Sequence, residues 1–284
     1  MANEKLANGM PVGPLLEARD LSMSYVSGNL WSRHRARVQA LDKVSLSIQQ
    51  NEILAVVGES GSGKSTLARV LTLMERPQVG SLLMNNEDLA QAPESRLRAL
   101  RPELQMIHQD VATSFNPRFT AVACVEEPLQ IEGKLPASER RQQALHWMEQ
   151  AGLPARFAER SPHELSRGQR QRLAIARALI RRPRLLLFDE TLSGLDLLIK
   201  AQMVELLLDL RRSFDLTYLF ISHDLGWVSD IASRVIVMQA GCIVEEQEAR
   251  KLFANPAHAH TKALIAAIPS LHPLPNVGTL ERQP

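Results

Sequence analysis

The sequence predicts an α/β fold built around a largely parallel sheet. The main observation is an apolar run, a glycine-rich loop and a helix in direct succession over residues 53–74. Residues 15–26 and 38–50 instead alternate apolar and polar side chains, the pattern of half-buried antiparallel strands. Strand patterns then disappear between about 111 and 182, which indicates a helical unit inserted into the α/β core.

The composition is that of a folded protein without a strong charge bias. Its 284 residues are 45% hydrophobic, enough to bury one large core or two smaller lobes. The net charge of +2 gives no overall attraction to nucleic acid or anionic lipid. No apolar run reaches the roughly 18 residues of a membrane helix, so we do not expect the chain to span a membrane. Cys124 and Cys242 form no C-x-x-C pair, and we interpret both as core or surface thiols in a reducing compartment.

Both ends of the chain are expected to lie outside the folded unit. Residues 1–14 contain glycines and prolines but no signal-peptide pattern, so they predict a flexible leader. Residues 273–284 predict a flexible tail, which leaves 15–272 as the folded domain. A basic insert at residues 31–37, between the first two strands, is interpreted as a solvated loop.

The glycine-rich loop has the composition of a phosphate cradle. Glycines let successive backbone N–H groups turn toward phosphate oxygens. Lys64 adds a charge for the β- and γ-phosphates, Ser65 offers a hydroxyl to Mg²⁺, and a helix from about Thr66 to Met74 directs its positive end there. A purely structural turn would leave Lys64 unexplained, so we predict a nucleotide site. The match to GxxxxGK[ST] is complete and comprises Gly58, Glu59, Ser60, Gly61, Ser62, Gly63, Lys64 and Ser65.

A second phosphate-related pattern is the apolar run 185–188, which ends in Asp189 and Glu190 and resembles a Walker B motif. A buried strand would place Asp189 beside the phosphate loop, where a carboxylate holds Mg²⁺ through water. Glu190 would then point at the attacking water as a general base. By itself such a run fits a strand cap as well as an active site. After a complete phosphate loop, it favours the active site.

Between these patterns, residues 165–169 read Leu-Ser-Arg-Gly-Gln and introduce a helix over 170–180. They resemble the signature of ABC ATPases, usually Leu-Ser-Gly-Gly-Gln. The phosphate loop, signature, Asp-Glu strand and a Ser-His-Asp segment follow the order of that family from about residue 15 to 272, so the chain is identified as a member. The resemblance implies an α/β P-loop NTPase (ABC ATPase) core with an N-terminal antiparallel β subdomain and an inserted α-helical subdomain.

The resemblance also implies roles for single residues. Tyr25 stands where the family stacks an aromatic ring on adenine, and residues 193–196 resemble the D-loop. Gln109 resembles the glutamine that senses Mg²⁺ and the transporter, and His223 the histidine that touches the γ-phosphate. Without the family, Tyr25 would be interpreted as a core residue and the other two as strand ends.

These assignments give three groups of expected site residues, with ATP and Mg²⁺ as cofactors. The catalytic group is Lys64, Gln109, Glu190 and His223, and the Mg²⁺ ligands are Ser65, Gln109 and Asp189. The residues expected to bind nucleotide, in this chain's site or a partner's, are Tyr25, Gly58, Glu59, Ser60, Gly61, Ser62, Gly63, Lys64, Ser65, Thr66, Ser166, Arg167, Gly168, Gln169 and Asp196.

Two positions depart from the family pattern. Arg167 replaces the first glycine of the usual signature, and Thr191-Leu192 stand where Pro-Thr or Pro-Val is common. In this family two ATPase domains dimerise head to tail, so Arg167 would act on the partner's nucleotide. Its guanidinium would either add charge-assisted hydrogen bonds to the γ-phosphate or hold the helix N-terminus away by its bulk. We expect hydrolysis that is retained but unequal between the two sites.

Four further segments, residues 109–110, 113–118, 127–129 and 255–264, resemble importers of the oligopeptide, dipeptide and nickel type. The basic insert resembles the second ATPase of such importers. The resemblance implies a peripheral subunit on the cytoplasmic face of the inner membrane, in a head-to-tail heterodimer with a second ATPase. Two membrane permeases and an extracytoplasmic solute-binding protein are the other expected partners, and nucleic acid is not one.

Two other functions share part of this evidence. An ABC exporter ATPase would have the same nucleotide residues but gives no reason for residues 115–117 or 255–264. A regulatory module that binds ATP with little hydrolysis is disfavoured by four intact residues, Lys64, Asp189, Glu190 and His223. The cargo stays open among peptides, nickel or a metal chelate, and opines.

Overall fold

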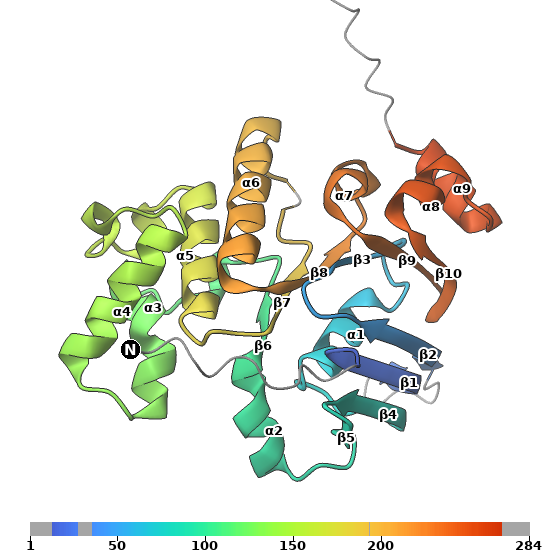
Figure 1. The fold of residues 1–284 in the computed structure, drawn as a ribbon, viewed down its shortest axis with the longest axis horizontal. Helices are drawn as coiled ribbons and strands as arrows, with labels where there is room; N and C mark the ends of the chain where they lie inside the picture. Colours follow the sequence, from blue (N-terminus) through green and yellow to red (C-terminus); the bar gives the residue numbers. More distant parts are fainter. Residues whose placement is uncertain (1–12, 28–35, 193, 269–284) are drawn as a thin grey trace, which may run out of the picture.

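The computed structural model describes residues 13–27, 36–192 and 194–268. The predicted leader up to residue 12, the basic insert up to residue 35, Ser193 of the predicted D-loop and the predicted tail lie outside these residues. Strands and helices alternate along the described part, as expected for an α/β fold (Figure 1).

A six-stranded sheet runs through the centre of the molecule (Figure 1). Its order is β10-β9-β3-β8-β7-β6, and neighbouring strands are parallel except β10 and β9. The central strands are almost wholly apolar and buried, as expected for parallel strands covered on both faces. The bounds are β3 Ile53–Val57, β6 Leu104–Ile107, β7 Leu185–Asp189, β8 Thr217–Ser222, β9 Arg234–Gln239 and β10 Cys242–Glu248.

A separate antiparallel sheet in the order β2-β1-β4-β5 confirms the alternating pattern of the first part of the chain. In β1, Leu16 and Ala18 are buried whereas Arg19 is exposed. The buried face shares a core with Leu67 and Leu71 of the helix that follows the phosphate loop. The bounds are β1 Leu16–Ser27, β2 Ala36–Ile48, β4 Val79–Met84 and β5 Glu87–Asp88.

The stretch from 111 to 182 is helical, and its described residues contain no strand. Its three helices lie together on the side of the molecule opposite the antiparallel sheet (Figure 1). They are α3 Ala121–Glu132, α4 Ala137–Gln150 and α5 Arg167–Leu179. The last begins three residues before the predicted helix because Ser166 caps it.

The remaining helices surround the central sheet. The helix after the phosphate loop begins and ends slightly earlier than predicted, at Lys64 and Leu71. The bounds are α1 Lys64–Leu71, α2 Glu94–Leu100, α6 Leu197–Phe214, α7 Leu225–Ile231, α8 Ala249–Ala254 and α9 Ala259–Ala266, with 3₁₀ turns at Arg101–Glu103, Ala112–Ser114, Ala155–Phe157 and Pro162–Glu164.

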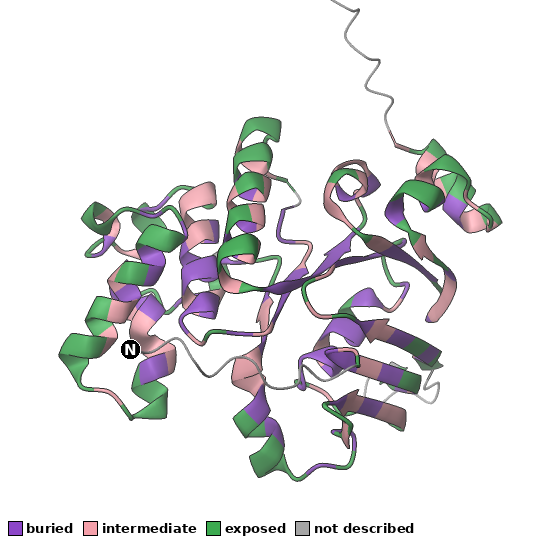
Figure 2. Cartoon of the chain, in the orientation of Figure 1, coloured by how far each residue is buried: buried purple, intermediate pink, exposed green. Residues whose placement is uncertain are grey.

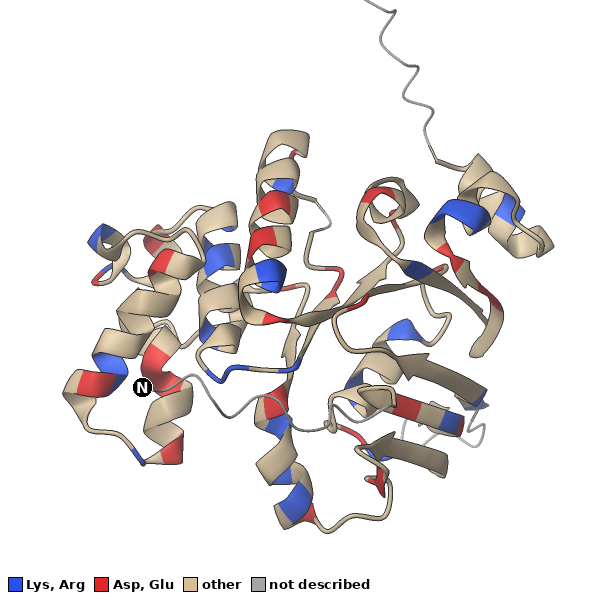
Figure 3. Cartoon of the chain, viewed as in Figure 1, with Lys and Arg blue, Asp and Glu red and all other residues tan. Residues whose placement is uncertain are grey.

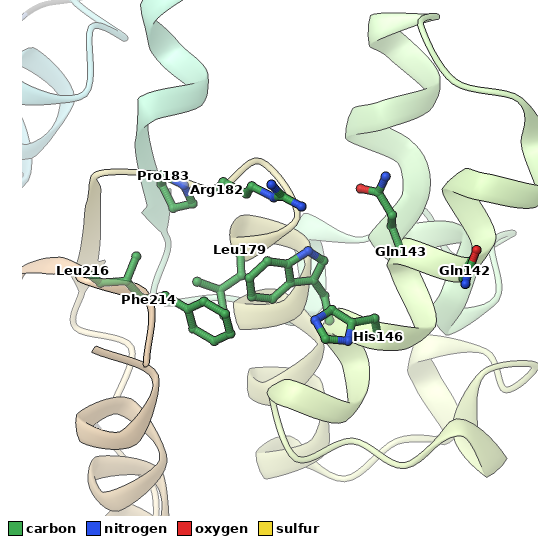
Figure 4. A pocket seen from close by; sticks show the side chains of 9 residues that line it. Gln142, Gln143, His146, Leu179, Arg182, Pro183, Phe214 and Leu216 are labelled. Carbon is green, nitrogen blue, oxygen red and sulfur yellow. The ribbon is translucent and has the colours of Figure 1, made fainter. Parts of the chain in front are cut away.

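Aromatic side chains join the helical layer to the rest of the fold. The ring centres of Trp147 in α4 and Phe214 in α6 lie 4.9 Å apart. Beside them, a cavity of about 540 Å³ lies between α4 and the ends of α5 and α6 (Figure 4). Its lining comes from α4, from the end of α5 and from the end of α6, with the residues just beyond these two ends, so the cavity lies where the helical layer meets α6. The lining is Gln142, Gln143, His146, Trp147, Leu179, Arg182, Pro183, Phe214 and Leu216.

Burial and charge follow this layered arrangement. Buried residues concentrate in the central strands, whereas the outer faces of the helices are exposed (Figure 2). Lys and Arg are interspersed with Asp and Glu over the helices in the view of Figure 3. Of the helices in the described ranges, none combines the length and hydropathy that a bilayer crossing requires.

Candidate nucleotide site

Three strand ends bring the predicted residues to one edge of the central sheet. β3, β8 and β7 are parallel neighbours, so their carboxyl ends meet at this edge. In the strand register, Val57 is opposite Ser222 and Asp189 is opposite Ile221. The phosphate loop after β3, the carboxylates at the end of β7 and the segment after β8 therefore lie beside one another.

The loop between β3 and α1 requires glycine because other backbone segments approach it closely. A Cβ on Gly58 would lie 2.2 Å from the carbonyl oxygen of Met238 in β9. One on Gly63 would lie 2.3 Å from the carbonyl oxygen of Ala40 in β2. Gly61 has open space around it, but its φ of +80° also favours glycine. The loop is thus held between the two sheets in a shape that other residues would disrupt.

Lys64 is 4% exposed, and its ammonium group folds back over the loop. Nζ donates hydrogen bonds to the carbonyl oxygens of Gly58 (2.9 Å) and Glu59 (2.7 Å) and to Oγ of Ser62 (3.2 Å). Burial lowers the pKa of Lys64, and the nearby carboxylate of Glu190 opposes that shift. The loop therefore presents a positioned cation next to the N-terminus of α1, an arrangement suited to phosphate.

Ser65 and Asp189 form the candidate Mg²⁺ site. The Ser65 hydroxyl donates to Oδ1 of Asp189 at 3.4 Å. Burial raises the pKa of Asp189, whereas the hydrogen bond from Ser65 and the charge of His108 lower it. Mg²⁺ takes oxygen ligands and keeps several waters while it binds one or two protein groups and substrate phosphates. The chemistry of this pair therefore fits Mg²⁺.

The structure does not join Gln109 to this pair. Gln109 is exposed and lies two residues beyond the end of β6. In the described ranges, no hydrogen bond connects it to Ser65 or Asp189. Its role as an Mg²⁺ ligand stays a prediction. It lines a hollow together with Asp110, Val111, Arg167, Arg170 and Gln171.

Glu190 and His223 come together beside the phosphate loop. Nδ1 of His223 lies 3.3 Å from Oε1 of Glu190. The backbone of Glu190 has a φ of 51°, and its N–H donates to the carbonyl oxygen of Ile221 at 3.0 Å. This left-handed backbone turns the chain as β7 ends. The His223 side chain is 55% exposed, so a substrate can reach it.

Tyr25 lies near the end of β1, next to α1. Arg69 of α1 donates to its hydroxyl at 3.2 Å, and the same hydroxyl donates to the carboxylate of Glu75. Tyr25 is 36% exposed. The position leaves ring surface free to contact a base, and adenine stacking stays a prediction.

The signature residues lie at the start of α5. Oγ of Ser166 accepts from the N–H of Gln169 at 3.3 Å, and Oε1 of Gln169 accepts from the N–H of Ser166 at 2.9 Å. This reciprocal capping box begins the helix. The Arg167 guanidinium packs against the predicted D-loop, since both of its terminal nitrogens lie 3.1 Å from where a Cβ on Gly194 would be.

Asp196 of the predicted D-loop has a structural task in its own chain. It begins α6 by accepting a hydrogen bond from the N–H of Ile199 at 2.9 Å. Lys200, in the same turn, pairs with Asp224 at 2.7 Å. Because Asp224 follows His223 directly, α6 is tied to the segment that carries this histidine.

Several functional contacts were missed by sequence reasoning. The sequence offered one signal that could have pointed to His108, its position next to Gln109. The other contacts join segments far apart in the chain, and no local pattern indicates them. They are the carbonyl contacts of Met238 and Ala40 with the phosphate loop, the packing of Arg167 on Gly194, and the Lys200–Asp224 pair.

Comparison with known proteins agrees with the geometry. A family model described as "ABC transporter" matches residues 41–193. The chain belongs to the ABC transporter family. This ABC ATPase is 44% identical over 262 residues to the di/tripeptide transport ATP-binding protein DppF of Pseudomonas aeruginosa. The aligned region covers 92% of this chain and 81% of DppF.

Two other similarities extend this result. The ABC ATPase is 41% identical over 261 residues to the glutathione import ATP-binding protein GsiA of Escherichia coli, covering 92% of this chain and 42% of GsiA. A solved dimer of the ATP-binding cassette MJ0796, in a post-hydrolysis state with ADP and Pi, matches with a TM-score of 0.72 at 29% identity, covering 83% of this chain and 99% of MJ0796. The predicted ABC ATPase fold and ATP hydrolysis are thereby confirmed, and the chain is an ATPase of the importer type.

Proposed function

We propose that this ATPase powers the import of small peptides. It would work at the cytoplasmic face of the inner membrane, in a head-to-tail heterodimer with a second ATPase beneath two permeases. A solute-binding protein would deliver the peptide from outside. The observation that carries the proposal is the 44% identity to DppF over 92% of the chain. The similarity to GsiA agrees with it, because glutathione is itself a tripeptide.

ATP binding begins at the phosphate loop. Lys64 exchanges its bonds to loop carbonyls for bonds to the β- and γ-phosphate oxygens, which carry more charge. Ser65 and Asp189 would hold Mg²⁺, which neutralises charge on the phosphates. The exposed surface of Tyr25 supports adenine, and stacking of this kind contributes about 1 to 3 kcal/mol.

Hydrolysis uses Glu190 and His223. The oxygen of a water molecule attacks the γ-phosphorus while its proton passes to the Glu190 carboxylate. The bond between the γ-phosphorus and the β,γ-bridging oxygen breaks, and ADP leaves with the electron pair. His223, 3.3 Å from Glu190, donates a hydrogen bond to the γ-phosphate and so aligns the phosphate with the attacking water.

The second ATPase completes this site with its own signature. In exchange, Ser166, Gly168 and Gln169 of this chain meet the partner's nucleotide. The start of α5 suits that task, because it combines exposed polar side chains with the positive end of a helix. The dimeric arrangement of the similar MJ0796 cassette supports such a pairing.

A groove between β6 and α3 is the docking surface that we propose for a permease helix. A cavity of about 290 Å³ there includes Met106, Pro128 and Ile131 in its lining. Ile131 is 80% exposed and Met74, at the same cavity, is 50% exposed. An adjoining hollow shares Gln105, Pro128 and Ile131, so the two form one continuous surface. An amphipathic helix would cover these apolar side chains.

Peptide transport by the assembled complex tests the proposal. The chain is purified with the second ATPase and the permeases of its gene neighbourhood, and is reconstituted in vesicles with the binding protein and ATP on opposite sides. We expect ATP-dependent transport of a labelled dipeptide or tripeptide, which Lys64→Ala abolishes and the control Arg212→Ala, at the exposed end of α6, does not. Transport of Ni²⁺ without competition by peptides would overturn the peptide assignment, and transport in the opposite direction would overturn import.

A further inference from the structure

The starts of α5 and α6 approach each other at two points within this chain. A Cβ added to Gly194 would lie 3.1 Å from both terminal nitrogens of Arg167, and one added to Gly168 would lie 3.2 Å from Cγ2 of Ile199. Figure 1 shows the two helices side by side. With the glycine that is usual in the signature, the first of these contacts would not exist. Arg167 therefore fills the space between the signature helix and the D-loop of its own chain.

The first turn of α6 continues the connection. Asp196 holds this turn through the N–H groups of Ile199 (2.9 Å) and Lys200 (2.9 Å). Nζ of Lys200 lies 2.7 Å from the Asp224 carboxylate, and the Lys200 side chain is only 15% exposed. The Asp224 side chain is 40% exposed, so the pair is shielded from solvent mainly on the lysine side.

Asp224 holds the conformation of the segment after β8 through hydrogen bonds on both sides. Its N–H donates to Oγ of Ser222 at 2.9 Å, and its Oδ1 accepts from the N–H of Gly226 at 3.1 Å. His223 lies between the two bonded residues and reaches Glu190 at 3.3 Å. A continuous series of contacts thus runs from the signature helix to the catalytic histidine of the same chain.

We propose that Arg167 is a positioning residue that couples the two nucleotide sites of the ATPase pair. The signature meets the partner's ATP, so a movement of α5 on that ATP would pass through Gly194, Lys200 and Asp224 to His223, which serves this chain's own ATP. The inference rests on the proposed function, because the pairing supplies the second nucleotide. It replaces a direct action of Arg167 on the partner's phosphate with an action through its own chain.

Hydrogen exchange on the isolated full-length chain tests the connection without the transporter. Arg167→Ala is expected to speed amide exchange at Ile199, Lys200 and Gly226 by about fivefold, the size of moderate coupling energies. Arg212→Ala, which removes an exposed arginine at the other end of α6, is the matched control and should leave these amides unchanged. Unchanged exchange in Arg167→Ala would overturn the proposal and favour direct contact with the partner's phosphate.

A double-mutant cycle locates the path of transmission. In a Lys200→Met background, Arg167→Ala should still alter Ile199 but no longer alter Gly226, because the link to Asp224 is missing. An effect on Gly226 that persists in this background would overturn the path through Lys200.

Kinetics of the assembled complex give the functional readout. Arg167→Ala should lower kcat about fivefold with little change in the KM for ATP, and Arg167→Lys should recover only part of the loss because an ammonium lacks the planar fork of guanidinium. A change in KM alone would overturn the proposed coupling. Failure of peptide transport would refute the proposed cargo and leave the exchange experiments valid.

Discussion

The phosphate loop and the signature helix serve the same chemistry, yet this chain builds them differently. Lys64 is buried, its hydrogen bonds stay within the loop, and carbonyls of β2 and β9 hold the loop glycines. Ser166 and Arg167 are exposed; Ser166 caps α5, and the Arg167 guanidinium lies against Gly194. The difference indicates that this chain by itself positions the phosphate loop and its lysine, whereas the signature is prepared for a surface outside the chain.

The largest expected effect is on chemistry at the phosphate side. Glu190→Gln should lower ATP hydrolysis by the assembled complex about 10²- to 10⁴-fold, because an amide cannot accept the proton of the attacking water. ATP affinity should be kept, since glutamine has nearly the same shape. Phosphate release and nucleotide titration measure the two quantities. Turnover near that of the wild type would remove Glu190 from the role of base.

Two glycines in the same loop test whether the neighbouring sheets hold it. Gly58→Ala should lower the free energy of unfolding by about 3 kcal/mol, because the new Cβ meets the Met238 carbonyl at 2.2 Å. Gly61→Ala has open space and should cost only about 1 to 2 kcal/mol for its left-handed backbone. Urea denaturation of the isolated chain measures both. Equal losses would show that the close contact with β9 does not hold the loop.

A matched pair of substitutions separates the two regions directly. Lys64→Ala should weaken ATP binding by the isolated chain about tenfold to a hundredfold, because hydrogen bonds to charged groups contribute about 1.5 to 3 kcal/mol. Ser166→Ala should lower the free energy of unfolding by about 1 kcal/mol through loss of the α5 cap, and leave ATP affinity unchanged. Nucleotide titration measures the ATP affinity of both variants, and urea denaturation measures their free energy of unfolding. A loss of ATP affinity in Ser166→Ala would contradict the division between the regions.

The smallest expected effect concerns the two thiols. Burial raises the pKa of Cys124, in α3 of the helical layer, to about 11, so its reactive thiolate is scarce at pH 8. Cys242, at the start of β10, is only half-buried. Mass spectrometry after alkylation of the native protein at pH 8 should find label on Cys242 well before Cys124. Equal labelling would indicate that the helical layer opens in the isolated chain.

Local sequence patterns predicted that the candidate residues of the phosphate side follow apolar strands, and the structure places them there. The phosphate loop, the Asp189-Glu190 pair and His223 each follow a strand of a parallel sheet, and the carboxyl ends of such strands must meet. Gln109 shows the limit of the same rule. It lies two residues beyond the end of β6 and lines the hollow beside Arg167. Its position near a strand end therefore did not predict its neighbours.

The sequence by itself determined the fold class and the order of the nucleotide motifs, because periodicity and loop composition depend on neighbouring residues. Only the tertiary structure decided that Met238 approaches Gly58, that Arg167 packs on Gly194 and that Lys200 pairs with Asp224. These contacts depend on how two sheets and two helices pack against each other. No spacing along the chain encodes that packing, because it minimises the free energy of the whole fold rather than of any one segment.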